Sequence, residues 1–139
     1  MKILVSACIL GKNCKYNGGN NYNHKVLEYL KGREVIEICP EVMAGLSTPR
    51  ACAEMRDGRI IDADGNDVDN QYREAVQTAM EKIKGMDINF AILQSRSPTC
   101  GVNQIYDGSF LGKLIEGRGL FAQALLEQGY RVIDAEDIK

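Results

Sequence analysis

Three cysteines of this chain come directly or shortly after separate apolar segments that are typical of buried strands. The segments are residues 2–7, 34–38 and 90–94, and the cysteines that follow them are Cys8, Cys39 and Cys100. Because the carboxyl ends of parallel strands meet in one crevice, we expect the three thiols to lie together there. Thiolates without imidazole partners favour zinc or an iron–sulfur cluster, and the spacing alone does not choose between the two.

The other two cysteines carry less information. Cys14 lies in a polar loop from which it could approach Cys8, so a structural and a functional role are equally supported. Cys52 sits between two alanines and is predicted to pack in the core, as free cysteines commonly do. The chain leads straight into a strand without an export signal, and its cysteine count is odd. We therefore expect free thiols in a reducing cytoplasm rather than a set of disulfides.

Composition and missing motifs exclude several classes of protein. The net charge of −2 and the pI near 5.5 leave no basic stripe, so we expect no nucleic-acid partner. The apolar runs are far too short for a membrane span. The single histidine, His24, excludes a histidine-rich zinc site and is predicted to lie exposed at a helix start. There is no Cys-x-x-Cys pair and no phosphate-binding P-loop. The stretch 117–119 resembles part of a dinucleotide fingerprint, but no strand precedes it, which favours a helix start that could hold an anion.

Alternating strand and helix patterns predict the scaffold of this site. Short continuous apolar runs at residues 3–5, 35–38, 90–93 and 132–133 are typical of strands covered on both faces. Apolar stripes at helical spacing predict helices near residues 25–31, 68–83 and 120–128, each followed by a glycine. Asp57-Gly58 predicts the turn of a hairpin within residues 53–62. We expect one α/β domain over residues 1–139, with a Rossmann-like three-layer architecture, a mostly parallel sheet and a small hairpin insertion.

Four groups of motifs, in order along nearly the whole chain, resemble the small bacterial thiouracil desulfidase family. They are residues 5–11, Cys39-Pro40-Glu41 with Thr48-Pro49-Arg50, residues 97–101 and residues 105–110. The resemblance implies a [4Fe–4S] cluster held by Cys8, Cys39 and Cys100, with a fourth iron free to bind the sulfur of a thiocarbonyl substrate. It also implies catalytic roles for Glu41 and Ser97. Cys14 and Cys52 lie outside this three-ligand pattern, and the sequence leaves open whether Cys14 is a fourth ligand.

The two residues that the resemblance implicates in catalysis each have a simpler interpretation. Glu41 lies two residues from a cluster ligand and is suited to moving protons between water, the ring nitrogen and the leaving sulfur. A glutamate in the first turn of a helix can instead bind backbone N–H groups there. Ser97 precedes Pro98, so its hydroxyl either caps a turn or contacts the substrate, and both roles are open.

The expected activity is non-redox desulfidation of thiolated pyrimidines like 2-thiouracil, or of related thioamides, giving the oxo compound and sulfide. The expected partner is therefore a small thiocarbonyl molecule, with no membrane partner, and the sequence does not indicate an oligomeric state. Two alternatives from other classes remain. One is a cluster-bearing sulfur carrier in thiolation, and the other is a zinc-stabilised module that binds a small molecule or another protein.

Overall fold

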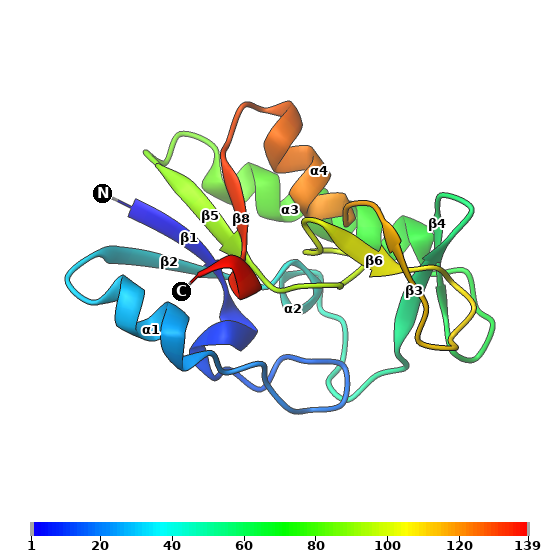
Figure 1. Cartoon of the computed structure of the whole chain (residues 1–139). Coiled ribbons are helices and arrows are strands. Elements are labelled where there is room, and N and C mark those ends of the chain that lie inside the picture. Colours follow the sequence, from blue (N-terminus) through cyan, green and yellow to red (C-terminus); the bar gives the residue numbers. More distant parts are fainter. Residues whose placement is uncertain (1, 139) are drawn as a thin grey trace.

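Within residues 2–138, which the computed structural model describes, four parallel strands form the central sheet (Figure 1). They are β1 (Lys2–Ser6), β2 (Glu34–Ile38), β5 (Phe90–Leu93) and β8 (Val132–Asp134), in the spatial order β2-β1-β5-β8. Strand β1 lies inside the sheet, where Ile3 is in register with Val35 on one side and with Phe90 on the other. The predicted strands and the mostly parallel sheet are thus confirmed.

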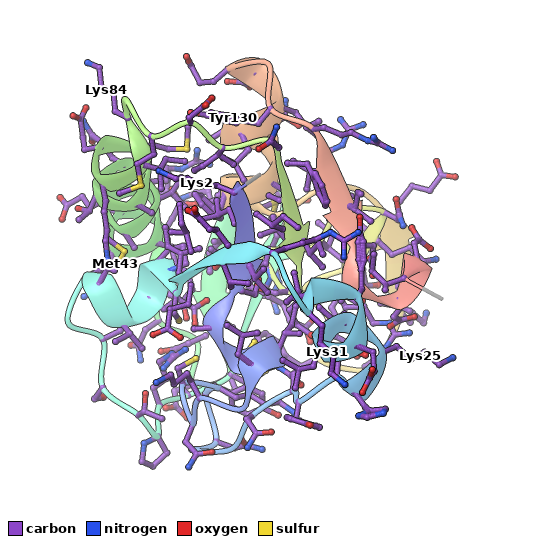
Figure 2. All side chains as sticks on the ribbon, turned by 90° about the vertical axis from the view of Figure 1, so that its left-hand side faces the viewer. Lys2, Lys25, Lys31, Met43, Lys84 and Tyr130 are labelled. Carbon is purple, nitrogen blue, oxygen red and sulfur yellow. The ribbon has the colours of Figure 1, made fainter. Side chains whose placement is uncertain are left out.

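Helices cover both faces of this sheet and complete the three predicted layers (Figures 1 and 2). Helix α1 (His24–Leu30) packs Val26 and Leu30 against Ile3 and Val5. On the opposite face, α3 (Asp69–Ile83) and α4 (Leu120–Glu127) pack against Leu4 of the same strand. Alternate residues of β1 therefore point into two different cores, which explains why the strand is apolar throughout.

Capping residues explain where the helices begin and end. The side chain of Asn23 accepts a hydrogen bond of 3.2 Å from the backbone N–H of Val26 and so caps α1. Helices α1, α3 and α4 each end two residues before a glycine in the left-handed region, at φ of 78°, 82° and 87°. None of the helices in residues 2–138 is both long and apolar enough to cross a membrane.

Two hairpins extend from the sheet toward the right of Figure 1. Strands β3 (Ala53–Arg56) and β4 (Arg59–Asp62) form the predicted hairpin, and Asp57 and Gly58 at its turn both have positive φ. A second hairpin, β6 (Gln104–Tyr106) with β7 (Leu114–Glu116), was not predicted. Helix α2 (Pro40–Met43) and the 3-10 helices η1 (Ala7–Leu10) and η2 (Ala135–Asp137) are further elements that the sequence did not reveal. Each of these elements has only three or four residues, too few to show a period.

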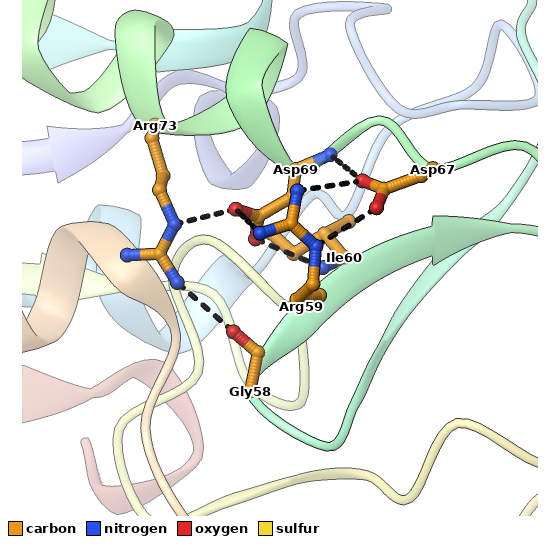
Figure 3. Close-up of polar contacts among 6 residues, drawn as sticks. All are labelled: Gly58, Arg59, Ile60, Asp67, Asp69 and Arg73. Carbon is orange, nitrogen blue, oxygen red and sulfur yellow. Dashed lines mark hydrogen bonds and ion pairs between the residues drawn. The ribbon is translucent and has the colours of Figure 1, made fainter.

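A buried carboxylate fastens the first hairpin to helix α3 (Figure 3). Asp69, at the start of α3, is only 1% exposed and accepts a hydrogen bond of 3.0 Å from the backbone N–H of Ile60 in β4. Its other oxygen accepts a bond of 2.6 Å from Arg73, one turn further along the helix. The neighbouring Asp67 binds Arg59 at the surface and accepts a bond from the N–H of Asp69. The hairpin is thus held at a fixed place on the helix.

We expect Asp69→Ala to lower the free energy of unfolding by about 2–3 kcal/mol, because it leaves the N–H of Ile60 buried without its partner. Urea unfolding followed by circular dichroism would measure the loss. Asp67→Ala is the matched control, since that carboxylate is exposed, and its effect should be clearly smaller. Equal losses for the two variants would show that Asp69 does not anchor the hairpin.

Candidate active site

The loops that follow β1, β2 and β5 surround one cavity of about 440 Å³. The chain runs from β1 to β2 on one side and later returns to β5 on the other, so this is the point where the strand order reverses. All five residues singled out by the sequence line the cavity, namely Cys8, Cys39, Cys100, Glu41 and Ser97. The predicted convergence of these side chains is therefore observed.

Local backbone structure fixes the first two of these cysteines. Cys8 lies in η1, and its carbonyl accepts hydrogen bonds from the N–H groups of Gly11 (3.2 Å) and Asn21 (3.0 Å). Gly11 ends η1 at a φ of 96°, a conformation that other residues rarely adopt. Cys39 is the N-cap residue of α2, and Pro40 occupies the first helical position, where the missing N–H costs no hydrogen bond.

Cys14 is buried and lines the same cavity as Cys8 and Cys39. The neighbouring thiol of Cys14 lowers the pKa of Cys8 to about 7 and also lowers the pKa of Cys39, while the pKa of Cys14 itself is raised by its proximity to Cys39. Burial raises the pKa of Cys100, which lies against the hydroxyl of Ser6. Cys8 and Cys39 are thus the thiols of this cavity most ready to ionise.

The carboxylate of Glu41 is held by side chains from two other loops. Its Oε1 accepts a hydrogen bond of 2.7 Å from the hydroxyl of Thr99, and its Oε2 is paired with the guanidinium of Arg50. The side chains of Glu41 and Arg50 are only 16% and 9% exposed. Glu41 does lie in the first turn of α2, but its carboxylate accepts hydrogen bonds from side chains rather than from the backbone N–H groups considered from the sequence.

Arg50 and Tyr72 are site residues that sequence reasoning did not single out. Arg50 also donates a hydrogen bond of 3.2 Å to the carbonyl of Cys14, so one guanidinium joins the loops after β1 and β2. Tyr72 reaches the cavity from α3 and contacts Arg50. Burial raises the pKa of Tyr72 to about 12, so its phenol stays neutral near pH 7 and keeps a proton to donate. Arg50 was visible in the motif Thr48-Pro49-Arg50, but nothing in that motif revealed its partner.

Ser97 caps the turn that presents Cys100. Its Oγ accepts hydrogen bonds from the backbone N–H groups of Thr99 (3.0 Å) and Cys100 (3.1 Å). The capping role that the sequence left open is therefore observed. Because the hydroxyl only accepts in these two bonds, its own hydrogen remains for a ligand in the cavity.

The start of α4 packs against the same turn rather than offering an anion site. The N–H groups of Leu120 and Phe121 donate to the carbonyls of Pro98 (2.9 Å) and Thr99 (2.8 Å). Gly119 lies so close to this backbone that a Cβ there would be 2.4 Å from the carbonyl carbon of Thr99. The expectation that the helix start after residues 117–119 could hold an anion is wrong, because the amides that would bind one are bonded within the protein.

A buried carboxylate anchors the rim of the cavity. Glu54, in β3, is 6% exposed and accepts hydrogen bonds from the N–H groups of Gly108 (3.0 Å) and Phe110 (3.1 Å). Arg56 of the same strand donates to the carbonyl of Gly108 at 2.6 Å. The loop between β6 and β7 is thereby fixed beside the site, and Gly112 of this loop lines the cavity.

Of the remaining predictions about single residues, the one for His24 is confirmed and the one for Cys52 is wrong. His24 is the first residue of α1, and its side chain is 73% exposed, as predicted. Cys52 is half-buried and lines the cavity instead of packing in the core. Burial raises its pKa, and Glu54 and Glu41 lie near enough to raise it further.

The donor set of the cavity fits a polynuclear metal group. All five cysteines line its wall, and His24, the only imidazole, is not among the lining residues. Within residues 2–138, no three Cys, His, Asp or Glu side chains surround a single point at ion-binding distance. The cysteines come from separate loops around the cavity, so that each could bind a different metal atom of a cluster.

Comparison with known proteins identifies relatives over nearly the whole chain. The model of the 2-thiouracil desulfurase family matches residues 3–137. The uncharacterized protein YbbK of Bacillus subtilis (strain 168) is 36% identical over 146 residues, covering 98% of this chain and 97% of YbbK. The solved structure of the [4Fe-4S]-dependent thiouracil desulfidase TudS superposes with a TM-score of 0.90 at 34% identity. That match covers 99% of this chain and 92% of the TudS chain.

We expect Gly119→Ala to displace the turn that carries Ser97, Thr99 and Cys100, because the added Cβ collides with backbone that cannot move aside. The variant should be destabilised and should lose metal, measured by thermal unfolding and by iron content after anaerobic reconstitution. Gly117→Ala is the matched control, since its Cβ would meet only the side chain of Ile105, at 3.1 Å. Normal metal content in Gly119→Ala would contradict the role given to this close contact.

Proposed function

The chain belongs to the 2-thiouracil desulfurase family, and on that basis we propose a [4Fe–4S]-dependent, non-redox removal of sulfur from thiolated pyrimidines such as 2-thiouracil. The observation that carries the proposal is the composition of the cavity, which cysteines from three loops line together with the carboxylate of Glu41 and the hydroxyl of Ser97. A volume of about 440 Å³ is in the range of small-molecule sites and suits a ligand as small as a nucleobase.

Cys8, Cys39 and Cys100 are the proposed cluster ligands. Each comes from a different loop at the carboxyl edge of the sheet, and each loop is fixed by backbone hydrogen bonds. When bound, the cluster supplies a thiophilic Lewis acid that polarises a C=S bond. A cluster also requires reduced thiols, so a cytoplasmic location is part of the proposal.

Glu41 is the proposed acid–base. Its carboxylate takes a proton from the water that attacks the thiocarbonyl carbon and returns a proton to the ring nitrogen or to the departing sulfur. Thr99 and Arg50 each bind one of its oxygens, which fixes the direction of the carboxylate and leaves lone pairs for a water. A positioned group of this kind contributes about 10²–10⁴-fold to the rate.

Ser97 is the proposed donor to the substrate. The two backbone N–H groups that bind its oxygen hold it at the edge of the cavity, and its hydroxyl hydrogen is free to stabilise charge on the reacting oxygen or sulfur. A hydroxyl held in this way loses little freedom when it binds.

The overall reaction is a hydrolysis. Water and the thiocarbonyl give the carbonyl and hydrogen sulfide, so the carbon keeps its formal oxidation state and no electron donor is consumed. On this proposal the enzyme is a hydrolase-type desulfidase whose partner is a small molecule, and neither a membrane nor nucleic acid takes part.

We expect Glu41→Gln to keep the cluster but to lose turnover of 2-thiouracil by about 10²-fold or more, because the amide cannot take a proton. Iron and sulfide content and single-turnover kinetics under anaerobic conditions would separate the two effects. Glu37→Gln is the matched control, since Glu37 lies on β2 with an exposed side chain. Joint loss of iron and activity would make Glu41 structural, and unchanged turnover would remove it from the mechanism.

Labelled water tests the hydrolytic stoichiometry. With the cluster intact and no reductant present, 2-thiouracil should be converted to uracil that carries oxygen from the water, with sulfide released in equal amount. A strict requirement for an electron donor or a persulfide acceptor would favour a sulfur carrier instead. A colourless protein that binds zinc and contains no labile sulfide would favour the zinc-stabilised binding module.

A further inference from the structure

We propose that Glu54 binds the substrate ring, through a hydrogen bond that one of its oxygens accepts from the ring N–H beside the thiocarbonyl carbon. This inference rests on the proposed function and deepens it, because it names a group that the substrate must carry. Glu54 lines the same cavity as Cys8, Cys39 and Cys100, and only 6% of it is exposed. A carboxylate so deeply buried at the wall of a small-molecule site is suited to a ligand that donates a hydrogen bond.

The two oxygens of Glu54 have different surroundings. Oε1 accepts the hydrogen bonds from the N–H groups of Gly108 (3.0 Å) and Phe110 (3.1 Å) that hold the loop after β6. Oε2 has no hydrogen-bond partner among residues 2–138. It is nevertheless open to solvent, since Nε of Arg50 is the only completely enclosed side-chain nitrogen or oxygen without a partner in that part of the chain. One oxygen of a buried carboxylate is thus left for a ligand in the cavity.

The carboxylate of Asp69 shows the arrangement expected of a purely structural acid (Figure 3). Its Oδ1 accepts a hydrogen bond from the N–H of Ile60 and its Oδ2 accepts one from Arg73, so both oxygens are used. Glu41, the other acid that lines the cavity, is likewise bound at both oxygens. Holding the loop after β6 uses only one oxygen of Glu54, and we assign the other to the substrate.

The chemistry of a thiolated uracil indicates which of its groups this oxygen binds. The ring carries an N–H at position 3, and this nitrogen is bonded to the sulfur-bearing carbon whether the sulfur is at position 2 or at position 4. A carboxylate oxygen only accepts hydrogen bonds. Glu54 therefore suits a cyclic thioamide with an N–H next to its C=S group, and it disfavours a ring that presents a nitrogen lone pair at the same place.

The test compares 2-thiouracil with 2-thiocytosine, which is of similar size but has no hydrogen on nitrogen 3. The amide of Glu54→Gln keeps a carbonyl oxygen for the two N–H groups of the loop, but it replaces the free acceptor by an N–H donor. Wild-type kcat/KM, measured anaerobically, should favour 2-thiouracil. Glu54→Gln should lower the ratio of the two kcat/KM values about tenfold or more, at unchanged iron content.

Arg56→Ala is the matched control for loosening of the loop. Arg56 lies on the same strand as Glu54 and binds the carbonyl of Gly108, but it is not among the residues that line the cavity. Its loss should therefore change kcat/KM for 2-thiouracil and for 2-thiocytosine by the same factor and leave their ratio unchanged.

A second measurement needs no variant and decides the question if Glu54→Gln does not fold. The isomers 1-methyl-2-thiouracil and 3-methyl-2-thiouracil have the same size, and only the first keeps the hydrogen on nitrogen 3. The wild type should convert the first isomer about tenfold more efficiently than the second, or better.

Two results would overturn the role of Glu54 and leave the proposed function intact. One is an unchanged ratio of the two kcat/KM values in Glu54→Gln, which would confine Glu54 to holding the loop. The other is equal conversion of the two methyl isomers by the wild type. A wild-type protein that contains the cluster but converts none of these compounds would instead overturn the proposed function, and the role of Glu54 with it.

Discussion

The guanidinium of Arg50 is the interaction on which the geometry of the site depends. It binds the carboxylate of Glu41, the carbonyls of Cys14 and Ser47, and the hydroxyl of Thr48, so three separate stretches of the chain meet at one side chain. Arginine suits this position because its five donors lie in a fixed plane and its charge is permanent. A pair that is so little exposed is costly to break, because the remaining charge would be buried without a partner. The loops after β1 and β2 therefore keep one arrangement.

The other half of the site is fixed by the backbone. The turn of Pro98, Thr99 and Cys100 lies between the hydroxyl of Ser97 on one side and the first turn of α4 on the other. Its carbonyls satisfy the N–H groups at the start of the helix, which would otherwise need caps or water. A loop supported in this way can hold the thiol of Cys100 and the hydroxyl of Ser97 to within a fraction of an ångström. Thr99 then links this half to Arg50 through Glu41.

The sequence predicts the parts of this arrangement that follow from periodicity and topology. Strands such as residues 90–93 are apolar because both faces are covered, and parallel strands bring Cys8, Cys39 and Cys100 to one edge. Side-chain contacts between different loops cannot be predicted from periodicity or topology. Thr99 meets Glu41 across 58 positions, and no local pattern records that pairing. The hairpin of β6 and β7 was missed because each strand has only three residues.

The electrostatics of the cavity favour a bound cation over a set of free thiolates. Glu41 lies close enough to raise the pKa of Cys8 and of Cys39, which opposes the lowering by the neighbouring thiol of Cys14. Burial raises the pKa of Cys100 and so favours its neutral thiol. Several thiolates beside a carboxylate would repel one another strongly in a half-enclosed space, and the charge of Arg50 is already engaged by Glu41. Metal binding resolves this conflict, since the metal replaces the thiol protons and supplies the missing positive charge. A single thiolate such as that of Cys8 is thus tolerated, whereas a full set of thiolates in this cavity needs the positive charge that a metal supplies.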